Sequence, residues 1–308
     1  MTGKNATEVL DADAQGVARA AAILERGELV AVPTETVYGL AARADDPDAV
    51  AAIYTAKGRP DFNPLIIHVT GTEQATRFAE VSSQSRELMD AYWPGPLTLV
   101  LPLRADCGLA PAVTAGLPTV ALRAPAHPIM RQLLKQLEFP LAAPSANRSG
   151  FISPTTPGHV LASLEGRIDA VIDGGPCEAG VESTIVAVRE DGSLEQLRPG
   201  PIEITGALPA EATTGVEAPG QLASHYAPGK PVRLGATEAG DDEFFIGFGG
   251  VGGDCTLSPT GDLMQGAARL YDCLHQAAAS AKPRIAVAVI PETGIGKAIN
   301  DRLRRAAA

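Results

Sequence analysis

VPTETVYGLAARADDPDAVAAIYTAKGRPDFNPLIIHV, residues 32–69, is the stretch that decides the fold of this chain. A strand-like apolar run, Leu29–Val32, breaks at Pro33 into a hydroxyl-rich turn, Thr34–Thr36. A second apolar strand, Leu65–Val69, closes the stretch and carries one polar interruption. Strands joined by a helical segment predict an α/β fold.

The segment between these two strands is helical and ends in a cationic loop. Pro47–Ala56 has Asp46 as a predicted N-cap and proline at its first position. It delivers Lys57 and Arg59 onto a Lys-Gly-Arg-Pro loop, and Asn63 follows. Two cations beside a glycine, followed by an amide, suit a triphosphate better than a protein core. We therefore predict a phosphate-binding site here.

Length and composition narrow the class of protein. A chain of 308 residues suggests two domains, and a hydrophobic fraction of 45% with 20% charged residues is ordinary for a globular protein. The net charge of −11 argues against a dedicated nucleic-acid binder, which normally has a basic face.

Cysteine spacing and the N-terminal segment give the expected compartment. The four cysteines form no C-x-x-C pair, so we predict packing thiols in a reducing compartment rather than a zinc or redox motif: Cys107, Cys177, Cys255 and Cys273. The first 16 residues lack the apolar run of a signal peptide, and no run approaches the roughly 20 apolar residues of a membrane span. We expect a cytoplasmic protein.

Apolar runs and helical patterns alternate irregularly over the first two thirds of the chain. Helical patterns cover 14–26, 72–92 and 127–138, and Gly27 stops the first of them. Further strands are predicted at Leu97–Leu103, Thr119–Arg123, Leu141–Ala143, Ala170–Asp173 and Thr184–Arg189. Because some strands follow each other without a helix, we predict a twisted sheet of mixed parallel and antiparallel strands.

The composition changes after residue 200. We predict a catalytic domain over 1–206, a linker over 207–232 that is rich in Ala, Pro, Gly and Thr, and a small C-terminal domain over 233–308. The small domain has a βαβα pattern, which predicts a Rossmann-like α/β unit with strands at Glu243–Phe248 and Arg284–Ile290 and helices at Leu263–Ala279 and Lys297–Ala306.

Two glycine motifs in the small domain are misleading. Residues 247–252, GFGGVG, fit G-x-G-x-x-G, but a turn follows where a dinucleotide site needs a helix, so we predict a simple glycine-rich loop. Residues 294–298, GIGKA, resemble the end of a P-loop but lack its leading glycine and the hydroxyl that binds magnesium. Any nucleotide must therefore be held by the first domain.

Candidate binding residues are the polar side chains on predicted loops and strand ends of the first domain. Such positions carry binding groups in open sheets. A single Ser or Asn in a turn is often only a turn residue, and His68 also suits a hydrogen-bonded core histidine. His127, His159 and His275 are expected to be structural or surface residues. The candidates are Thr34, Thr36, Lys57, Arg59, Asn63, His68, Arg123, Ser145, Asn147, Ser153, Ser183 and Arg198.

Four blocks in order carry a family resemblance: P-T-E-T-V-Y-G-L, K-G-R-P with N-P-L, A-P-S-A-N-R-S-G and E-S-T-I-V. Over roughly residues 14–205 the chain resembles the YrdC-type threonylcarbamoyl-AMP synthase family. Ser-His-Tyr-Ala-Pro, residues 224–228, resembles the linker motif of the two-domain members, and the remaining residues resemble a short version of their C-terminal domain.

The resemblance implies a nucleotidyl transfer. L-threonine and bicarbonate form a carbamate that attacks the α-phosphate of ATP, which releases pyrophosphate and leaves threonylcarbamoyl-AMP for tRNA threonylcarbamoyladenosine modification. The implied partners are thus ATP, L-threonine, bicarbonate and the downstream tRNA threonylcarbamoyl-transfer proteins. Mg²⁺ is expected to arrive with the ATP phosphates, because no Asp/Glu ligand cluster is evident.

The resemblance also assigns residues to each substrate. The implied threonine-binding residues are Thr36, His68, Arg123, Ala143 (through its backbone) and Ser183. The implied ATP-binding residues are Arg59, Asn63, Thr119, Ser145, Asn147, Ser153, Arg198 and Tyr226. Lys57 and Arg59 are the implied catalytic residues, since cations can stabilise the charge that grows on the leaving pyrophosphate. Arg123 can pair with the amino-acid carboxylate through two hydrogen bonds.

Two alternative functions and two interpretations of Tyr226 remain. A non-catalytic RNA-binding factor of the same fold is the alternative of a different class. The acidity of the chain weighs against it, and weak RNA binding beside catalysis stays compatible with a small local basic patch. A carbamoyl-transfer domain like that of hydrogenase-maturation proteins is the enzymatic rival. Tyr226 either anchors the linker or acts as a lid over the nucleotide, with Pro228 and Gly229 as the hinge.

Overall fold

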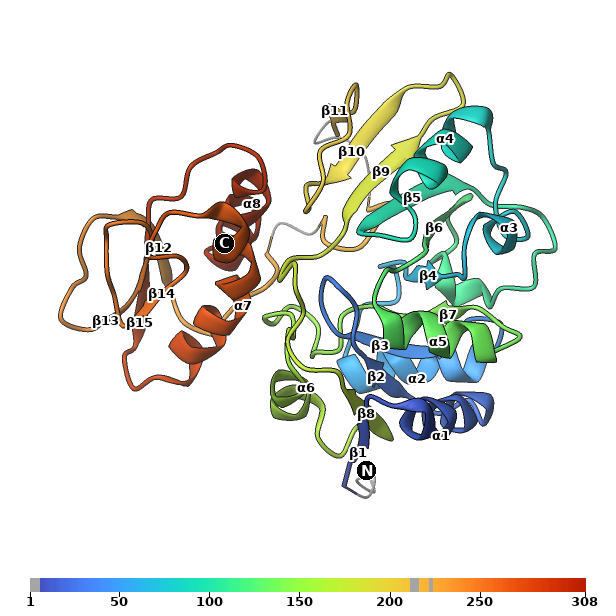
Figure 1. Cartoon of the computed structure of the whole chain (residues 1–308), viewed down its shortest axis with the longest axis horizontal. Helices are drawn as coiled ribbons and strands as arrows, with labels where there is room; N and C mark the ends of the chain where they lie inside the picture. The colour runs from blue at the N-terminus through green and yellow to red at the C-terminus, as the bar shows by residue number, and fades with distance from the viewer. Residues whose placement is uncertain (1–5, 211–215, 222–223) are drawn as a thin grey trace.

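The computed structural model describes residues 6–210, 216–221 and 224–308. Parts of the predicted linker, at 211–215 and 222–223, and the first five residues lie outside the described residues. The described chain forms one eleven-stranded and one four-stranded sheet, each with its own helices (Figure 1). The predicted fold class, a mixed sheet with a second small α/β unit, is confirmed.

The large sheet mixes parallel and antiparallel neighbours. For example, β4 and β6 are parallel, whereas β5 and β6 are antiparallel. In spatial order the strands are β1 (Glu8–Asp11), β8 (Ala170–Asp173), β2 (Val30–Val32), β3 (Gly39–Arg43), β7 (Leu141–Ala142), β4 (Ile66–His68), β6 (Thr119–Arg123), β5 (Leu97–Pro102), β9 (Thr184–Val188), β10 (Leu194–Arg198) and β11 (Leu208–Pro209). The predicted linker therefore begins as an edge strand, β11.

Helices cover both faces of the large sheet. Val30 and Val32 point to the face that α1 and α5 cover, whereas Ala31 points to the opposite core, as the period of two along a strand requires. The helices of this domain are α1 (Ala14–Glu25), α2 (Pro47–Lys57), α3 (Thr72–Ala75), α4 (Ser83–Tyr92), α5 (Pro128–Gln136), α6 (Pro157–Leu164) and the short 3-10 helix η1 (Pro111–Val113).

The single helix predicted over 72–92 is wrong, because the chain forms α3 and α4 with a break between them. Ala79 makes an isolated bridge to Leu103, which holds the intervening segment against β5. The hydroxyl of Ser82 then accepts the Ser85 amide at 3.1 Å and caps a new helix. A long-range contact and a local cap together override a continuous helical pattern.

The small domain is a parallel sheet with two helices on one side. Its strand order is β12 (Val232–Ala236), β15 (Arg284–Ala288), β13 (Glu243–Gly247) and β14 (Cys255–Thr256). Helices α7 (Leu263–Ala279) and α8 (Gly296–Ala306) lie between this sheet and the large domain (Figure 1). Because α7 begins only at Leu263, residues 247–252 open no helix and form the glycine-rich loop that was predicted.

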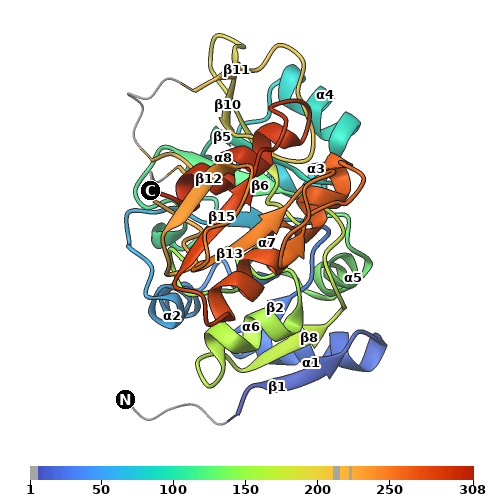
Figure 2. The same cartoon turned by 90° about the vertical axis from the view of Figure 1, so that its left-hand side faces the viewer.

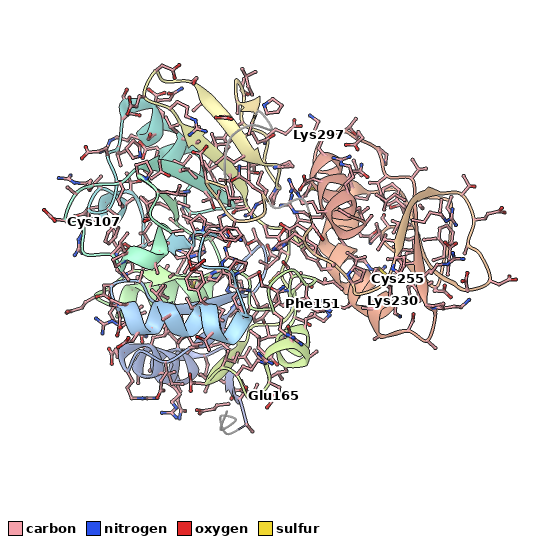
Figure 3. All side chains as sticks on the ribbon, turned by 180° about the vertical axis from the view of Figure 1, so that it is seen from behind. Cys107, Phe151, Glu165, Lys230, Cys255 and Lys297 are labelled. Carbon is pink, nitrogen blue, oxygen red and sulfur yellow. A yellow bond between two sulfur atoms is a disulfide. The ribbon has the colours of Figure 1, made fainter. Side chains whose placement is uncertain are left out.

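The expectation that all four cysteines are reduced packing thiols is wrong for two of them. Cys255 and Cys273 form a disulfide that joins β14 to α7, and Figure 3 labels Cys255 in the small domain. Their separation of 18 residues gave no signal, since only the packing of α7 on the sheet brings them together. Cys107 and Cys177 are free thiols.

The two domains meet at a tightly packed seam. The apolar core of the small domain extends to Val37, Ile152 and Val181 of the large domain. Gly180 has φ +68°, and a Cβ there would lie 2.3 Å from the Ala267 carbonyl of α7, so only glycine permits this approach. In Figure 2 the small domain faces the viewer and lies over the large one. Within the described residues, none of the helices has the length and apolarity that crossing a membrane requires.

Candidate active site

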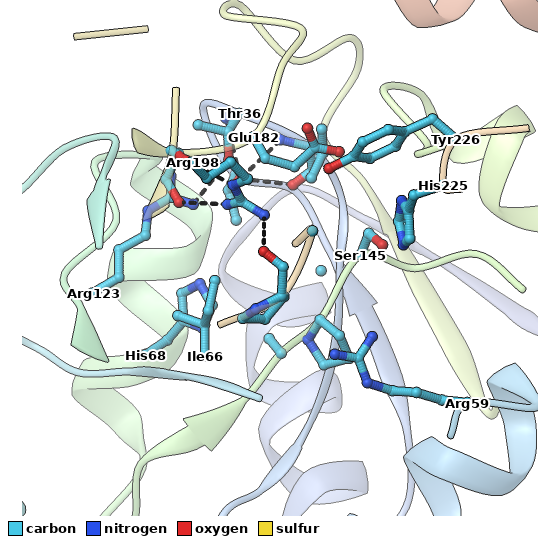
Figure 4. A pocket seen from close by; sticks show the side chains of 18 residues that line it. Thr36, Arg59, Ile66, His68, Arg123, Ser145, Glu182, Arg198, His225 and Tyr226 are labelled. Atoms are coloured by element: carbon cyan, nitrogen blue, oxygen red, sulfur yellow. Dashed lines mark hydrogen bonds between the residues drawn. The ribbon is translucent and has the colours of Figure 1, made fainter. Parts of the chain in front are cut away.

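A cavity of about 50 Å³ lies between the large sheet and the linker. Ile66 and His68 of β4 and Arg123 of β6 form its floor, and His225 and Tyr226 of the linker cover it. The predicted site residues that line it are Thr34, Thr36, Arg59, His68, Arg123, Ala143, Ser145, Ser183, Arg198 and Tyr226. Figure 4 shows His68 and Arg123 on one side and Arg59, His225 and Tyr226 on the other.

A rigid hydroxyl turn follows β2. The Thr34 hydroxyl donates to the Val37 carbonyl at 2.6 Å and accepts the amides of Thr36 and Val37 at 3.1 and 3.2 Å. Such side-chain bonds to nearby backbone groups fix a turn where Pro33 has already ended the strand. The Thr36 hydroxyl is thereby held in the cavity wall, 2.9 Å from the Thr34 hydroxyl.

Arg123 is held in the cavity by three acceptors. Its Nη1 donates to the Thr36 hydroxyl at 2.9 Å, its Nη2 to Glu35 at 2.6 Å and its Nε to the Gly95 carbonyl at 3.2 Å. Because a guanidinium has five N–H groups, two remain for a ligand carboxylate. Burial raises the pKa of Glu35, but its pair with Arg123 outweighs burial and lowers that pKa overall.

His68 provides a neutral acceptor beside this arginine. It pairs with Arg123 in the register of β4 and β6 and is 3% exposed. Burial, and then the charge of Arg123, lower the pKa of His68 to about 3. Within the described part of the chain, its Nδ1 has no hydrogen-bond partner. A neutral imidazole has one acceptor nitrogen, which can accept a hydrogen bond from a ligand hydroxyl or amine.

Ser183 and Arg198 form a second buried unit. Arg198 donates to the Ser183 carbonyl and to its hydroxyl, both at 3.1 Å, and the same hydroxyl lies 2.8 Å from Thr98. Arg198 also donates to the Pro219 carbonyl of the linker at 3.2 Å. Burial lowers the pKa of Arg198 from its usual 12.5. Arg198 therefore connects Ser183 in the pocket wall to Pro219 in the linker.

Arg59 reaches the cavity from the loop that ends α2. Gly58 closes that helix with φ 60°, a left-handed conformation that glycine adopts readily. Arg59 then folds back and donates to the carbonyls of Asn63 and Pro64 at 3.1 and 2.8 Å. Burial lowers the pKa of Arg59 to about 10, so the guanidinium remains charged near neutral pH.

Lys57 lies outside the cavity lining, although it was predicted to act beside Arg59. Its ammonium donates to the Ser145 and Asn147 carbonyls, each at 2.5 Å, and burial lowers its pKa well below 10.5. The structure thus brings Lys57, Ser145 and Asn147 together, and Lys57 fixes the loop that carries Ser145.

Four predicted ATP-binding residues also lie outside the cavity lining. Asn63 is buried, and its Oδ1 has no partner within the ranges that the structure describes. Asn147 donates to the carbonyls of Arg148 and Phe151. Thr119 begins β6 on the same face as Arg123, about 13 Å away along the strand. Ser153 donates to Glu182 at 2.6 Å. Their assignment to ATP stays a prediction.

The remaining histidines take structural positions. His127 caps α5 by accepting the Ile129 amide at 3.3 Å. His159 of α6 stacks on His275 of α7, with ring centroids 3.9 Å apart, across the domain seam.

Two acidic residues of the site were not predicted from the sequence. Glu35 was noted only as part of a turn, although it holds Arg123. Glu182 lines the cavity and pairs with Arg302 of α8 at 2.9 Å. The acid beside Ser183 in E-S-T was visible, but no local pattern connects it to an arginine 120 residues later.

Comparison with known proteins places this fold and site in a family. Residues 22–200 match the Sua5/YciO/YrdC family model, described as "Telomere recombination", and residues 190–308 match "Threonylcarbamoyl-AMP synthase, C-terminal domain". The chain belongs to the Sua5/YciO/YrdC family, in its two-domain form.

Individual relatives cover nearly the whole chain. A Bacillus subtilis threonylcarbamoyl-AMP synthase is 39% identical over 98% of this chain and 95% of its own length. The Pyrococcus abyssi enzyme of the same name is 39% identical over 93% of this chain and 92% of its own length. A crystal structure of P. abyssi Sua5 complexed with L-threonine superposes with a TM-score of 0.90 at 34% identity, covering 98% of both chains.

Proposed function

We propose that this protein is a threonylcarbamoyl-AMP synthase. The reaction joins L-threonine, bicarbonate and ATP, and it yields threonylcarbamoyl-AMP and pyrophosphate. One observation carries the proposal: a single cavity has an amino-acid-binding side at Arg123, Thr36 and His68 and a cationic side at Arg59. The near full-length relatives named for this activity support it.

The amino-acid side suits threonine. The two free N–H groups of Arg123 would bind its carboxylate, which is a strong charge-assisted interaction. Neutral His68 and the Thr36 hydroxyl offer partners for the amine and the side-chain hydroxyl of the substrate. With its carboxylate held, the amine of threonine condenses with bicarbonate to give the carbamate and water.

The cationic side suits the triphosphate. A carbamate oxygen forms a bond to the α-phosphorus of ATP as the bond to the bridging oxygen of pyrophosphate breaks. Arg59 would stabilise the negative charge that develops on the leaving pyrophosphate, as such transfers require. Lys57 would act indirectly, because it holds the Ser145–Asn147 loop against this side.

We further propose that Mg²⁺ enters with ATP. The described residues contain no group of three His, Cys, Asp or Glu side chains that could hold a metal ion, and the phosphates of ATP are themselves ligands for Mg²⁺. The ion would offset phosphate charge when bound. The mixed-anhydride product is labile in water, and we propose that cytoplasmic tRNA threonylcarbamoyl-transfer proteins take it up.

Substrate selectivity tests the proposal. The protein is incubated with ATP, Mg²⁺, bicarbonate and threonine, serine or valine, and pyrophosphate and the AMP adduct are measured. Serine lacks one methyl group, so we expect a roughly 10- to 200-fold preference for threonine over it. Valine leaves buried polar partners unpaired and should react far less. Pyrophosphate release that does not depend on threonine, or equal turnover of valine, would contradict the proposal.

A further inference from the structure

The small domain holds an acidic residue of the pocket in the large domain. The Glu182 carboxylate, 6% exposed, accepts the Ser153 hydroxyl at 2.6 Å. The Tyr271 hydroxyl lies 2.9 and 2.8 Å from its two oxygens, and Arg302 Nε donates to it at 2.9 Å. Because Tyr271 is on α7 and Arg302 is on α8, two of the three side chains around this carboxylate come from the small domain.

Arg302 contacts three segments around the pocket at once. Besides Glu182, it donates from Nη1 to the Pro199 carbonyl at 2.8 Å, directly after Arg198. Its guanidinium carbon lies 5.5 Å from the ring centroid of Tyr226, close enough for a cation–π contact. A single fully buried side chain therefore touches the Glu182 loop, the end of β10 and the linker.

This arrangement is poorly explained by stability alone. A buried ion pair is weak evidence for stability, because removing two charges from water costs about as much as their attraction gains. Moreover, Nη2 of Arg302 is buried with no hydrogen-bond partner in the described ranges, which carries a further penalty. Burial raises the pKa of Glu182, but Arg302 and then Arg198 outweigh it and bring that pKa to about 2. The carboxylate is thus ionised.

Loss of Arg302 would disturb the site next to it. An ionised buried carboxylate needs a cation, and Arg198 lines the same cavity as Glu182 and, after Arg302, lowers its pKa most through its charge. Arg198 makes two hydrogen bonds to Ser183, which follows Glu182 in the chain. A carboxylate that turned toward Arg198 would compete for those bonds.

We propose that Arg302 and Tyr271 are positioning residues for the substrate pocket. By keeping Glu182 paired and bonded to Ser153, they leave Arg198 free to hold Ser183 in the pocket wall. The inference rests on the proposed function. It gives the small domain a part in substrate binding, because Tyr271 and Arg302 hold Glu182 in the pocket lining.

Arg302→Met in the full chain tests the proposal, with Arg304→Met as the matched control. Arg304 lies on the same helix and makes only an exposed pair with Glu292. We expect Arg302→Met to lower kcat/KM for threonine and for ATP by about 100-fold, as misplacement of binding groups does, and the control to match wild type. A threefold change in kcat/KM corresponds to well under about 1.4 kcal/mol. If Arg302→Met folds and its kcat/KM lies within about threefold of that of the control, the proposal is overturned.

Two further variants separate positioning from folding. Tyr271→Phe keeps the ring and removes one hydroxyl; it should fold normally and lose about tenfold in kcat/KM, the scale of one hydrogen bond. Full activity there would count against the proposal. The pair Glu182→Gln with Arg302→Met removes the carboxylate that would compete for Arg198, so its kcat/KM should recover most of what Arg302→Met loses. If the folded double variant stays as low in kcat/KM as Arg302→Met, competition for Arg198 is not the cause and the proposal is overturned.

A binding readout keeps this inference distinct from the proposed function. Calorimetric titration with ATP, and separately with threonine, reports on the pocket without any turnover. Weaker binding by Arg302→Met but not by Arg304→Met would support positioning even if wild type released no pyrophosphate. Equal binding by both variants would overturn it even if wild type proved to be an active synthase.

Discussion

At the scale of single residues, the pocket depends on cationic side chains whose burial disfavours their charged form. Arg59 is 9% exposed, yet it stays charged with a pKa of about 10. It donates to the backbone carbonyls of Asn63 and Pro64 in its own loop, so its removal should spare the fold. We predict that Arg59→Ala lowers pyrophosphate release at least 100-fold, the scale seen when one electrostatic donor is removed from a reacting centre. Steady-state kinetics with a circular-dichroism check on folding measure this, and wild-type rates would rule out the assignment.

Glu35 should matter through Arg123. Its carboxylate holds the guanidinium and accepts the Ala126 amide at 3.1 Å, so Glu35→Gln leaves the shape but loses the charge. Hydrogen bonds to charged groups contribute about 1.5–3 kcal/mol, and we predict KM for threonine to rise about tenfold with KM for ATP unchanged. Glu28→Gln, which removes an exposed pair with Arg26, is the control. Equal effects on both substrates would contradict this role.

Local sequence signals located many pocket residues because they sit in short loops at strand ends. Thr36 follows a proline that ends a strand, and Arg59 follows a helix-closing glycine, so each position could be predicted from its neighbours. Lys57 shared the same signal, but nothing local showed that its ammonium turns toward the Ser145 loop. Arg302 had no signal at all, because only the docking of α8 brings it to Glu182.

At the scale of elements, the linker covers the pocket. Tyr226 is 1% exposed, and its φ of 63° lies in the left-handed region that side chains rarely adopt. Gly220, at φ +87°, packs against the same residue, since a Cβ there would lie 2.9 Å from the Tyr226 hydroxyl. Such strained backbone persists where surrounding contacts hold it, and it is typical of segments that close over a site.

We predict that Tyr226→Ala in the full chain impairs synthesis and raises futile ATP hydrolysis. A labile carbamate and a mixed anhydride both need protection from water, which the ring would provide. Tyr226→Phe keeps the ring and should behave like wild type. The measurement is the ratio of AMP adduct to free AMP. An unchanged ratio in the alanine variant would mean that the residue only anchors the linker.

Element prediction succeeded where the pattern was local and failed where distant contacts intervene. The helix over Leu263–Ala279 was predicted with the observed bounds, because its apolar stripe and Asp262 cap are contiguous in sequence. The pattern over 72–92 looked equally helical, yet the bridge from Ala79 to Leu103, just after β5, interrupts it. β11 could not be foreseen, since two residues of an edge strand carry no periodicity.

At the scale of the whole molecule, the histidines make the assembly sensitive to acid. Burial lowers the pKa of each of the five, and three of them, His159, His225 and His275, lie where the linker and small domain meet the large one. Below pH 6.5 the histidines of the unfolded chain bind protons, whereas the histidines of the folded chain stay neutral to lower pH. Stability is therefore complete above pH 6.5 and falls as the pH drops toward 4.

For His275 the loss of stability with falling pH can be stated in kcal/mol. Its pKa falls from 6.5 to about 4 through burial first and then the charge of His159, which corresponds to about 3 kcal/mol of stability lost across that window. We predict that His275→Gln flattens the dependence of the unfolding free energy on pH between 6.5 and 4. Denaturant titrations at several pH values measure it. A slope equal to that of wild type would show that His275 contributes nothing to the acid response.

The small volume of the cavity affects the apparent affinity of the protein for ATP. At about 50 Å³ it is well below the roughly 300 Å³ at which small-molecule sites begin, so we predict that a nucleotide binds to molecules whose linker has moved aside. The observed dissociation constant for ATP then equals the intrinsic constant divided by the fraction of open molecules. Substitutions confined to the linker, which leave the pocket wall intact, can tighten apparent binding while they slow the reaction. Affinity and catalytic competence are therefore separate quantities in this enzyme, and they can change in opposite directions.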